Sequence, residues 1–235
     1  GLARRRYRAL GLFAHFDWPR RAPLVELLRL GGPIGVMLFA EVSLFGAVAL
    51  LMASFGAVTA AAYQIAIAVS SFSFMFPMGL ATGIAVVVAQ ATGAGRAAKA
   101  HRAGRVGIVL ALAFELLAAI LILVLRRPIA QLFSGNAAVI DLAVQLLVLA
   151  AAFQLSDGLQ VASAGALRGL KDVRVPMLIT VLAYWGTGLP LAWALGFKFG
   201  VGPVGVWMGL IAGLTVAGVL LAWRFLHRTP ALHPV

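Results

Sequence analysis

Two carboxylates, Glu41 and Asp157, lie near the middle of apolar stretches long enough to cross a bilayer. A charge at the centre of a membrane helix costs about 2.5–3.5 kcal/mol on insertion scales, so it is rarely present without a partner or a role. In a medium of low dielectric constant a carboxylate is neutralised by a proton or paired with a cation. The two acids are therefore the first candidates for binding a proton or another cation.

The two acids are expected at similar depth. Glu41 follows Pro33 by eight residues and Asp157 precedes Leu167 by ten. At a rise of 1.5 Å per residue they lie roughly 12 and 15 Å from the same predicted membrane edge. Their helices run in opposite directions, so we expect both side chains to face one cavity.

Polar residues accompany Asp157 along its helix. Gln154, Asp157 and Gln160 recur every three residues, and such a stripe on a spanning helix is expected to face water or the protein interior. Phe153, one turn before Asp157, is placed to form a wall of the site or to offer its ring face to a cation. Gln64 contributes to a weaker polar face on the second apolar stretch.

Structural interpretations of these acids stay open at this point. Asp157 could be a hydrogen-bond hub that ties helices together, and Glu41 could be a protonated carboxyl group bonded to a neighbouring helix. A third acid, Glu115, lies at comparable depth in the third apolar stretch, where its sequence neighbours are wholly apolar. We interpret Glu115 as protonated or bonded between helices rather than functional.

The composition is that of a membrane protein. The chain is 63% hydrophobic and 11% charged, with a mean hydropathy of +1.03, and it contains no Cys. The net charge of +12 does not indicate nucleic-acid binding, because the basic residues cluster between apolar stretches and form no stripe with interleaved aromatic residues. The absence of Cys excludes disulfides, thiolate metal sites and Cys nucleophiles.

The fold class predicted is an all-α membrane protein. Residues 30–226 are expected to form a lobe of six transmembrane helices, because a length of about 20 apolar residues recurs six times. Pro77 predicts a kink in the second helix, and Pro190 predicts an interruption of the fifth. The predicted helices are Leu30–Phe55, Thr59–Thr92, Val106–Leu125, Ala137–Leu167, Val175–Phe197 and Pro203–Leu226.

The basic residues predict an orientation. With the amino terminus inside, sixteen of the 19 Lys and Arg residues fall on the cytoplasmic side, and only Arg126, Arg127 and Lys198 fall outside. This asymmetry predicts a multi-pass membrane protein with both termini in the cytoplasm. Residues 1–29 are expected to be a cytoplasmic basic connector lying on membrane lipid, and residues 227–235 a cytoplasmic tail.

Small residues spaced four apart predict close helix packing. They occur at Gly79/Gly83, Gly165/Gly169, Gly205/Gly209 and Gly209/Gly213.

Enzyme signatures are missing. The sequence has no HExxH, GxSxG or P-loop motif, and its four His residues fall in polar connectors or the tail without metal-ligand spacing. The "TGAGR" segment follows a membrane helix and lacks the GKS or GKT of a phosphate loop. We therefore expect that the protein is not an enzyme.

Three segments together resemble one family. The first segment is "PIGVMLFAEVSLFGAVALLMASFGAVTAAAYQIAIAVSSFSFMFPMGLATGIAVVVAQATGAGR". It is similar to the first helical hairpin of the carboxy-terminal lobe of MATE transporters, the NorM-like multidrug and toxic compound extrusion family. The second segment is "FQLSDGLQVASAGALRGLKDVRVPMLI", which resembles the fourth helix of that lobe with the turn after it. The third segment is "GVGPVGVWMGLIAG", which resembles the start of the last helix of the lobe. The resemblance covers roughly Leu30 to Leu226.

The resemblance implies one lobe of a two-lobed, twelve-helix exporter that exchanges Na⁺ or H⁺ for cationic amphipathic drugs by alternating access. It implies no cofactor besides the coupling ion. The family's carboxy-lobe cation site has a glutamate at the position of Glu41 and an aspartate at that of Asp157, which would also hold Na⁺ in a sodium-coupled member. Some members have a tyrosine where this chain has Phe153, and a second acid where it has Ser156.

The missing partner is expected to be an amino-terminal six-helix lobe. The chain begins at Gly1 rather than at Met and enters at once on a basic stretch. We therefore interpret it as a segment of a longer polypeptide that carries the first lobe.

Two other functions remain as alternatives. A related flippase for lipid-linked saccharides would be favoured by mid-membrane Arg or Lys residues, and none occurs in the predicted helices. A membrane scaffold subunit that transports nothing would leave Glu41 and Asp157 without a role.

Overall fold

The structure, a computed structural model, describes residues 21–228. The connector predicted at residues 1–29 and the tail predicted at residues 227–235 lie for the most part outside the described residues. The chain divides into two units, residues 1–32 and residues 33–235. The second unit contains the described helices from Pro33 onward.

The described part of the chain consists of helices joined by short turns, without a β-strand. Six helices are long and apolar enough to cross a membrane, the fifth of them built from four shorter segments. This confirms the predicted all-α class and the six spans. The elements are α2 (Arg21–Ala53), α3 (Ala57–Gly93), α4 (Ala97–Phe133), α5 (Ala137–Gly169), the fifth helix with α6 (Arg174–Val181), η1 (Leu182–Gly188), α7 (Leu189–Trp193) and η2 (Ala194–Lys198), and α8 (Pro203–His227).

Helix α4 is longer at both ends than the predicted range Val106–Leu125. The basic residues near its ends lower the local hydropathy, but Lys and Arg are good helix formers whose charged heads can reach water from a helix end. The "TGAGR" segment before α4 is a turn that ends α3, with Gly95 at φ +69° and its N–H donating to the Thr92 carbonyl. Glycine is the residue that adopts this left-handed conformation without strain.

The predicted interruption of the fifth helix at Pro190 is confirmed. Pro190 has no N–H to donate to the carbonyl one turn earlier. The backbone before it adopts π-helical geometry over Leu182–Gly188, and the Leu189 N–H donates to the Tyr184 carbonyl, five residues back. Helix α3, in contrast, continues through Pro77.

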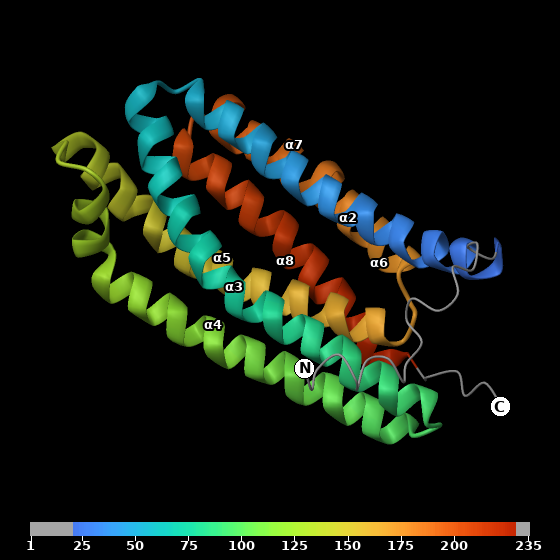
Figure 1. Cartoon of the computed structure of the whole chain (residues 1–235). Coiled ribbons are helices and arrows are strands. Elements are labelled where there is room, and N and C mark those ends of the chain that lie inside the picture. Colours follow the sequence, from blue (N-terminus) through green and yellow to red (C-terminus); the bar gives the residue numbers. More distant parts are fainter. Residues whose placement is uncertain (1–20, 229–235) are drawn as a thin grey trace, which may run out of the picture. The chain divides into compact units, whose positions relative to one another are not determined.

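Helix α5 is at the centre of the bundle. It packs against α3, α4 and α8, and α8 packs in turn against the interrupted fifth helix. Figure 1 shows α3, α4 and α5 running side by side, with α8 between α5 and the segments α6 and α7. The central position of α5 explains why most of its polar residues are buried.

Glycines permit some of these close contacts. A Cβ added at Gly165 would lie 2.5 Å from a carbonyl oxygen of α3, and one at Gly209 would lie 2.2 Å from a backbone nitrogen of α7. Close packing at these spacings was predicted. At Gly79 and Gly83 the prediction was wrong for the described chain, because nothing lies within 4 Å of an added Cβ at either position.

The buried apolar residues form two separate clusters along the helices, with a set of polar residues between them. Glu41, Ser70, Glu115 and Asp157 come from four different helices and occupy this intermediate level, which we call the polar layer. The cluster residues that flank it are Met37 and Leu44 on α2, Ala66 and Ile84 on α3, Ala111 and Ala119 on α4, and Phe153 and Ala162 on α5.

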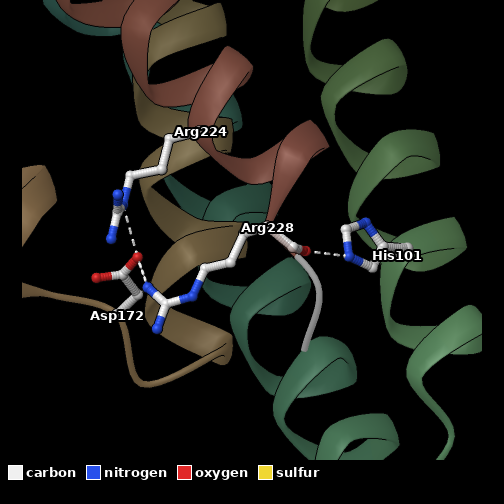
Figure 2. Close-up of polar contacts among 4 residues, drawn as sticks. All are labelled: His101, Asp172, Arg224 and Arg228. Atoms are coloured by element: carbon white, nitrogen blue, oxygen red, sulfur yellow. Dashed lines mark hydrogen bonds and ion pairs between the residues drawn. The ribbon is translucent and has the colours of Figure 1, made fainter. Parts of the chain in front are cut away.

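A charged cluster closes one end of the bundle. Asp172, between α5 and α6, accepts a hydrogen bond from Arg224 Nε at 2.8 Å and also pairs with Arg228. The His101 Nε2 atom on α4 lies 2.6 Å from the Arg228 carbonyl oxygen. Figure 2 shows both arginines converging on Asp172 from the end of α8. The contacts join α8 to α4 and to the α5–α6 connection.

Replacing Asp172 by Asn is expected to lower the free energy of unfolding by about 1–3 kcal/mol. This is less than the cost of breaking a fully buried ion pair. The Asp172 side chain is 6% exposed, but those of Arg224 and Arg228 are 29% and 36% exposed, so water partly compensates the orphaned arginines. Thermal unfolding in detergent measures the effect. Asp141→Asn is the control, since Asp141 and Arg127 are about two-thirds exposed and 3.8 Å apart. Equal decreases in melting temperature for Asp172→Asn and Asp141→Asn would contradict the expectation.

Candidate cation-binding site

Helices α2, α3 and α5 enclose a cavity of about 290 Å³ at the polar layer. It brings together four of the predicted site residues, the two acids with Phe153 and Gln64. The cavity is lined by Glu41, Val42, Phe45, Ala49, Tyr63, Gln64, Ile67, Ser70, Ser71, Phe74, Phe153 and Asp157.

The other two predicted site residues, Gln154 and Gln160, do not line the cavity. A step of three residues turns the side chain by about 60° around the helix, so the three polar residues spread over about 120° and only the middle one, Asp157, faces the cavity. Both glutamines are buried inside the bundle. The side chain of Gln154 makes no hydrogen bond with any described residue.

Aromatic rings fix the wall beside Asp157. The ring of Phe153 packs edge-on against Phe45 at 6.0 Å and against Trp207 at 5.9 Å between centroids, and Tyr63 packs edge-on against Trp207 at 6.1 Å. Such edge-to-face contacts orient rings as well as burying them. The site therefore has a rigid aromatic wall next to a carboxylate.

Tyr63 is a lining residue that the sequence interpretation missed, because tyrosine was counted within an apolar stretch. Its hydroxyl donates to the Phe45 carbonyl at 3.3 Å, which links α3 to α2. The phenolic oxygen keeps a lone pair that can accept a proton or contact a cation. Tyr63 thus supplies a phenolic hydroxyl group to the cavity, whereas Phe153 has none. A second hydroxyl, that of Ser70, has no partner among the described residues.

Glu115 lies in the same polar layer but outside the cavity lining. Ser73 Oγ of α3 is 3.5 Å from its Oε2 atom, a long hydrogen bond between helices. Its Cγ atom would be 2.6 Å from a Cβ at Gly158, so the glycine next to Asp157 makes room for this side chain. The placement agrees with the interpretation of Glu115 as an acid bonded between helices.

The chemistry of the cavity is that of oxygen donors. Two carboxylates, the hydroxyls of Tyr63 and two serines and the amide of Gln64 line it, and no basic residue is among the lining residues. Hard monovalent cations favour such donors. Among the described residues no group of three or more His, Cys, Asp or Glu residues gathers as a transition-metal site would require. The set is suited to a proton, Na⁺ or an organic cation.

Comparisons with known proteins agree on one family. The MatE family model matches residues 33–194. Multidrug resistance protein PmpM of Pseudomonas aeruginosa is 44% identical over 222 residues, which are 93% of this chain and 46% of the relative. The probable multidrug resistance protein NorM of Xanthomonas campestris is 46% identical over 221 residues, covering 94% of this chain and 48% of the relative.

A solved structure shows the same fold. The outward-facing structure of a multidrug resistance MATE family transporter of the MOP superfamily superimposes with a TM-score of 0.84 at 20% identity, over 92% of this chain and 48% of that one. The chain spans about half the length of the relatives it matches. Six membrane-crossing helices and bacterial relatives identify a multi-pass bacterial membrane protein. Since the family model matches well over half of the chain, the protein belongs to the MatE family.

Proposed function

We propose that the chain is the carboxy-terminal lobe of a secondary active multidrug efflux antiporter, which exports organic cations in exchange for Na⁺ or H⁺. One observation carries the proposal. Glu41 and Asp157, from helices far apart in sequence, line a single cavity that has aromatic walls and no basic lining residue. Relatives named as multidrug resistance proteins support the class of cargo.

Exchange follows from competition for the carboxylates. In low dielectric surroundings a carboxylate needs a proton or a cation, so the coupling ion and the drug exclude one another from the same charge. Rings such as Phe153 and Tyr63 add cation–π attraction for an organic cation. A change of access from one side of the membrane to the other then converts this competition into coupled transport.

The size of the cavity supports a two-lobed site. Pockets for drug-sized ligands occupy about 300–1,000 Å³, and the cavity of about 290 Å³ lies at the lower limit. This lobe alone would hold an ion or the cationic group of a drug. We propose that the rest of the drug contacts an amino-terminal lobe on the same polypeptide, in keeping with relatives about twice as long.

The lining disfavours the flippase alternative. A lipid-linked saccharide carries phosphate groups, which basic side chains would have to bind. The cavity presents two carboxylates instead.

The function is tested by Glu41→Gln in the complete transporter. We expect loss of drug efflux driven by an imposed Na⁺ or pH gradient in proteoliposomes, because the amide keeps the shape of the side chain but loses its charge. The control is Asp141→Asn, which removes an exposed carboxylate outside the cavity. Wild-type efflux from Glu41→Gln would show that this carboxylate is not needed for the exchange and would contradict the proposed site.

The orientation is a second part of the proposal, with both ends of the chain in the cytoplasm. Single Cys residues introduced on this Cys-free background near Lys99 and Lys171 are expected to react with an impermeant maleimide only after permeabilisation. Cys residues near Ser134 and Lys198 should react in intact cells. Labelling of the Lys99 turn in intact cells would reverse the assignment, which rests on the distribution of Lys and Arg.

A further inference from the structure

Helices α3 and α4 border a groove of about 870 Å³ that is separate from the cation-binding cavity. Its lining residues on each helix follow spacings of three and four, so each helix contributes one continuous face. At its floor the helices touch, since a Cβ at Gly107 would lie 2.3 Å from Ile84. The sides are formed by Leu80, Gly83 and Val87 of α3 and by Lys99, Val106 and Leu110 of α4, with Arg102 beside Lys99.

The groove is as long as one leaflet of a bilayer is deep. From Lys99 to Leu110 there are eleven residues, or about 16 Å of helix, and half of a hydrocarbon core is about 15 Å. Lys99 and Arg102 lie at the end of the groove near the α3–α4 turn, and the remaining lining residues are small or apolar. The groove therefore has a charged head and an apolar body.

The two cations at the head are unpaired. Lys99 and Arg102 are exposed, and neither forms a hydrogen bond or ion pair with another residue in the described part of the chain. No acidic residue lines the groove. Arg224 and Arg228, at the same end of the bundle, are in contrast both paired with Asp172. The head of the groove thus offers two free cations one turn apart.

We propose that this groove binds an acidic phospholipid of the surrounding bilayer, with the phosphate on Lys99 and Arg102 and an acyl chain along Val87, Val106 and Leu110. A guanidinium binds phosphate oxygens through two parallel hydrogen bonds, and an ammonium adds a point charge beside it. Basic pockets between transmembrane helices are known to take anionic headgroups. An organic cation of the kind proposed as cargo would be repelled by the same two residues.

Gly83 allows the groove to be filled without disturbing the bundle. Nothing lies within 4 Å of a Cβ added there, and Gly83 lines the groove. Gly83→Phe would therefore place a ring where the acyl chain is proposed to lie. Gly79, one turn earlier on α3, is equally open but outside the groove, so Gly79→Phe is a matched control.

The test is native mass spectrometry of the complete transporter in a non-ionic detergent, titrated with phosphatidylglycerol or phosphatidylcholine. We expect phosphatidylglycerol to be retained in preference to phosphatidylcholine. The double variant Lys99→Gln/Arg102→Gln should bind it roughly 30-fold more weakly, the product of the contributions expected of two basic residues at an anionic headgroup. Arg105→Gln, which removes an exposed charge outside the groove, should have little effect.

Filling the groove provides the second arm. Gly83→Phe should also weaken retention of phosphatidylglycerol, whereas Gly79→Phe should leave it unchanged, with equal thermal stability of both variants as the check on folding. Equal retention of the two lipids, or equal losses for the double variant and Arg105→Gln, would overturn the proposal. So would efficient cross-linking of Gly83→Cys to the other lobe of the transporter, since a protein segment would then occupy the groove.

Discussion

Replacing Asp157 by Asn is expected to reduce coupled drug efflux to background while leaving the amount of membrane-inserted protein unchanged. Asp157 is 4% exposed, lines the cavity and lies beside the aromatic wall formed by Phe153. An amide of the same size can neither release a proton nor balance the charge of a cation. Removing a mid-membrane carboxylate makes insertion easier, so loss of efflux with normal abundance identifies a functional defect.

The measurement is efflux from drug-loaded proteoliposomes under an imposed Na⁺ or pH gradient, normalised to transporter content. The matched control is Glu115→Gln, because Glu115 is a buried acid of the same polar layer but does not line the cavity. Its amide can still accept the hydrogen bond from Ser73, so most activity should remain. Coupling at the wild-type level in Asp157→Asn would remove the central claim, and a larger loss in Glu115→Gln would move the site to that acid.

The substitution Gly209→Val is expected to prevent correct packing of the lobe. A Cβ at Gly209 would lie 2.2 Å from the Ala192 nitrogen and 2.3 Å from its Cα atom. Overpacking of a core typically costs about 1–3 kcal/mol, and more where the obstacle is backbone that cannot rotate away. Here α7 and α8 would have to separate. We expect loss of the monodisperse peak in detergent gel filtration, or a melting temperature well below that of the wild type.

Gly79→Val separates this contact from the general effect of a β-branched residue in a helix. Gly79 is also in the interior of a helix, but nothing lies within 4 Å of its added Cβ. This variant should elute and melt like the wild type. If the two valine variants behaved alike, the close approach of α7 and α8 would not be the cause.

The properties predicted correctly from the sequence are those set within one helix. The number of spans follows from the length of apolar stretches. The shared level of Glu41 and Asp157 follows from the helical rise, because eight and ten residues from the same edge reach nearly the same depth. The interruption at Pro190 follows from a missing backbone donor.

The properties that sequence reasoning missed depend on which helices are neighbours. Gln154 and Gln160 share a helix with Asp157, but only the positions of α2 and α3 decide which side of α5 faces the cavity. Tyr63 was counted within an apolar stretch, although it lines the cavity and its hydroxyl donates to the Phe45 carbonyl. Gly79 and Gly83 have the spacing of a packing motif, yet no helix of the described chain covers them.

The division of the apolar core by the polar layer has a consequence for electrical leakage. An ion moving along the bundle axis would have to cross an apolar cluster on either side of the layer, each of them built from buried aliphatic and aromatic side chains. Moving a bare ion into such a medium costs of order 20 kcal/mol in the idealised limit. The exposed lining residues Gln64 and Ser71 instead mark a place where an ion can enter the cavity. The two apolar clusters therefore form a barrier to ions along the axis of this lobe.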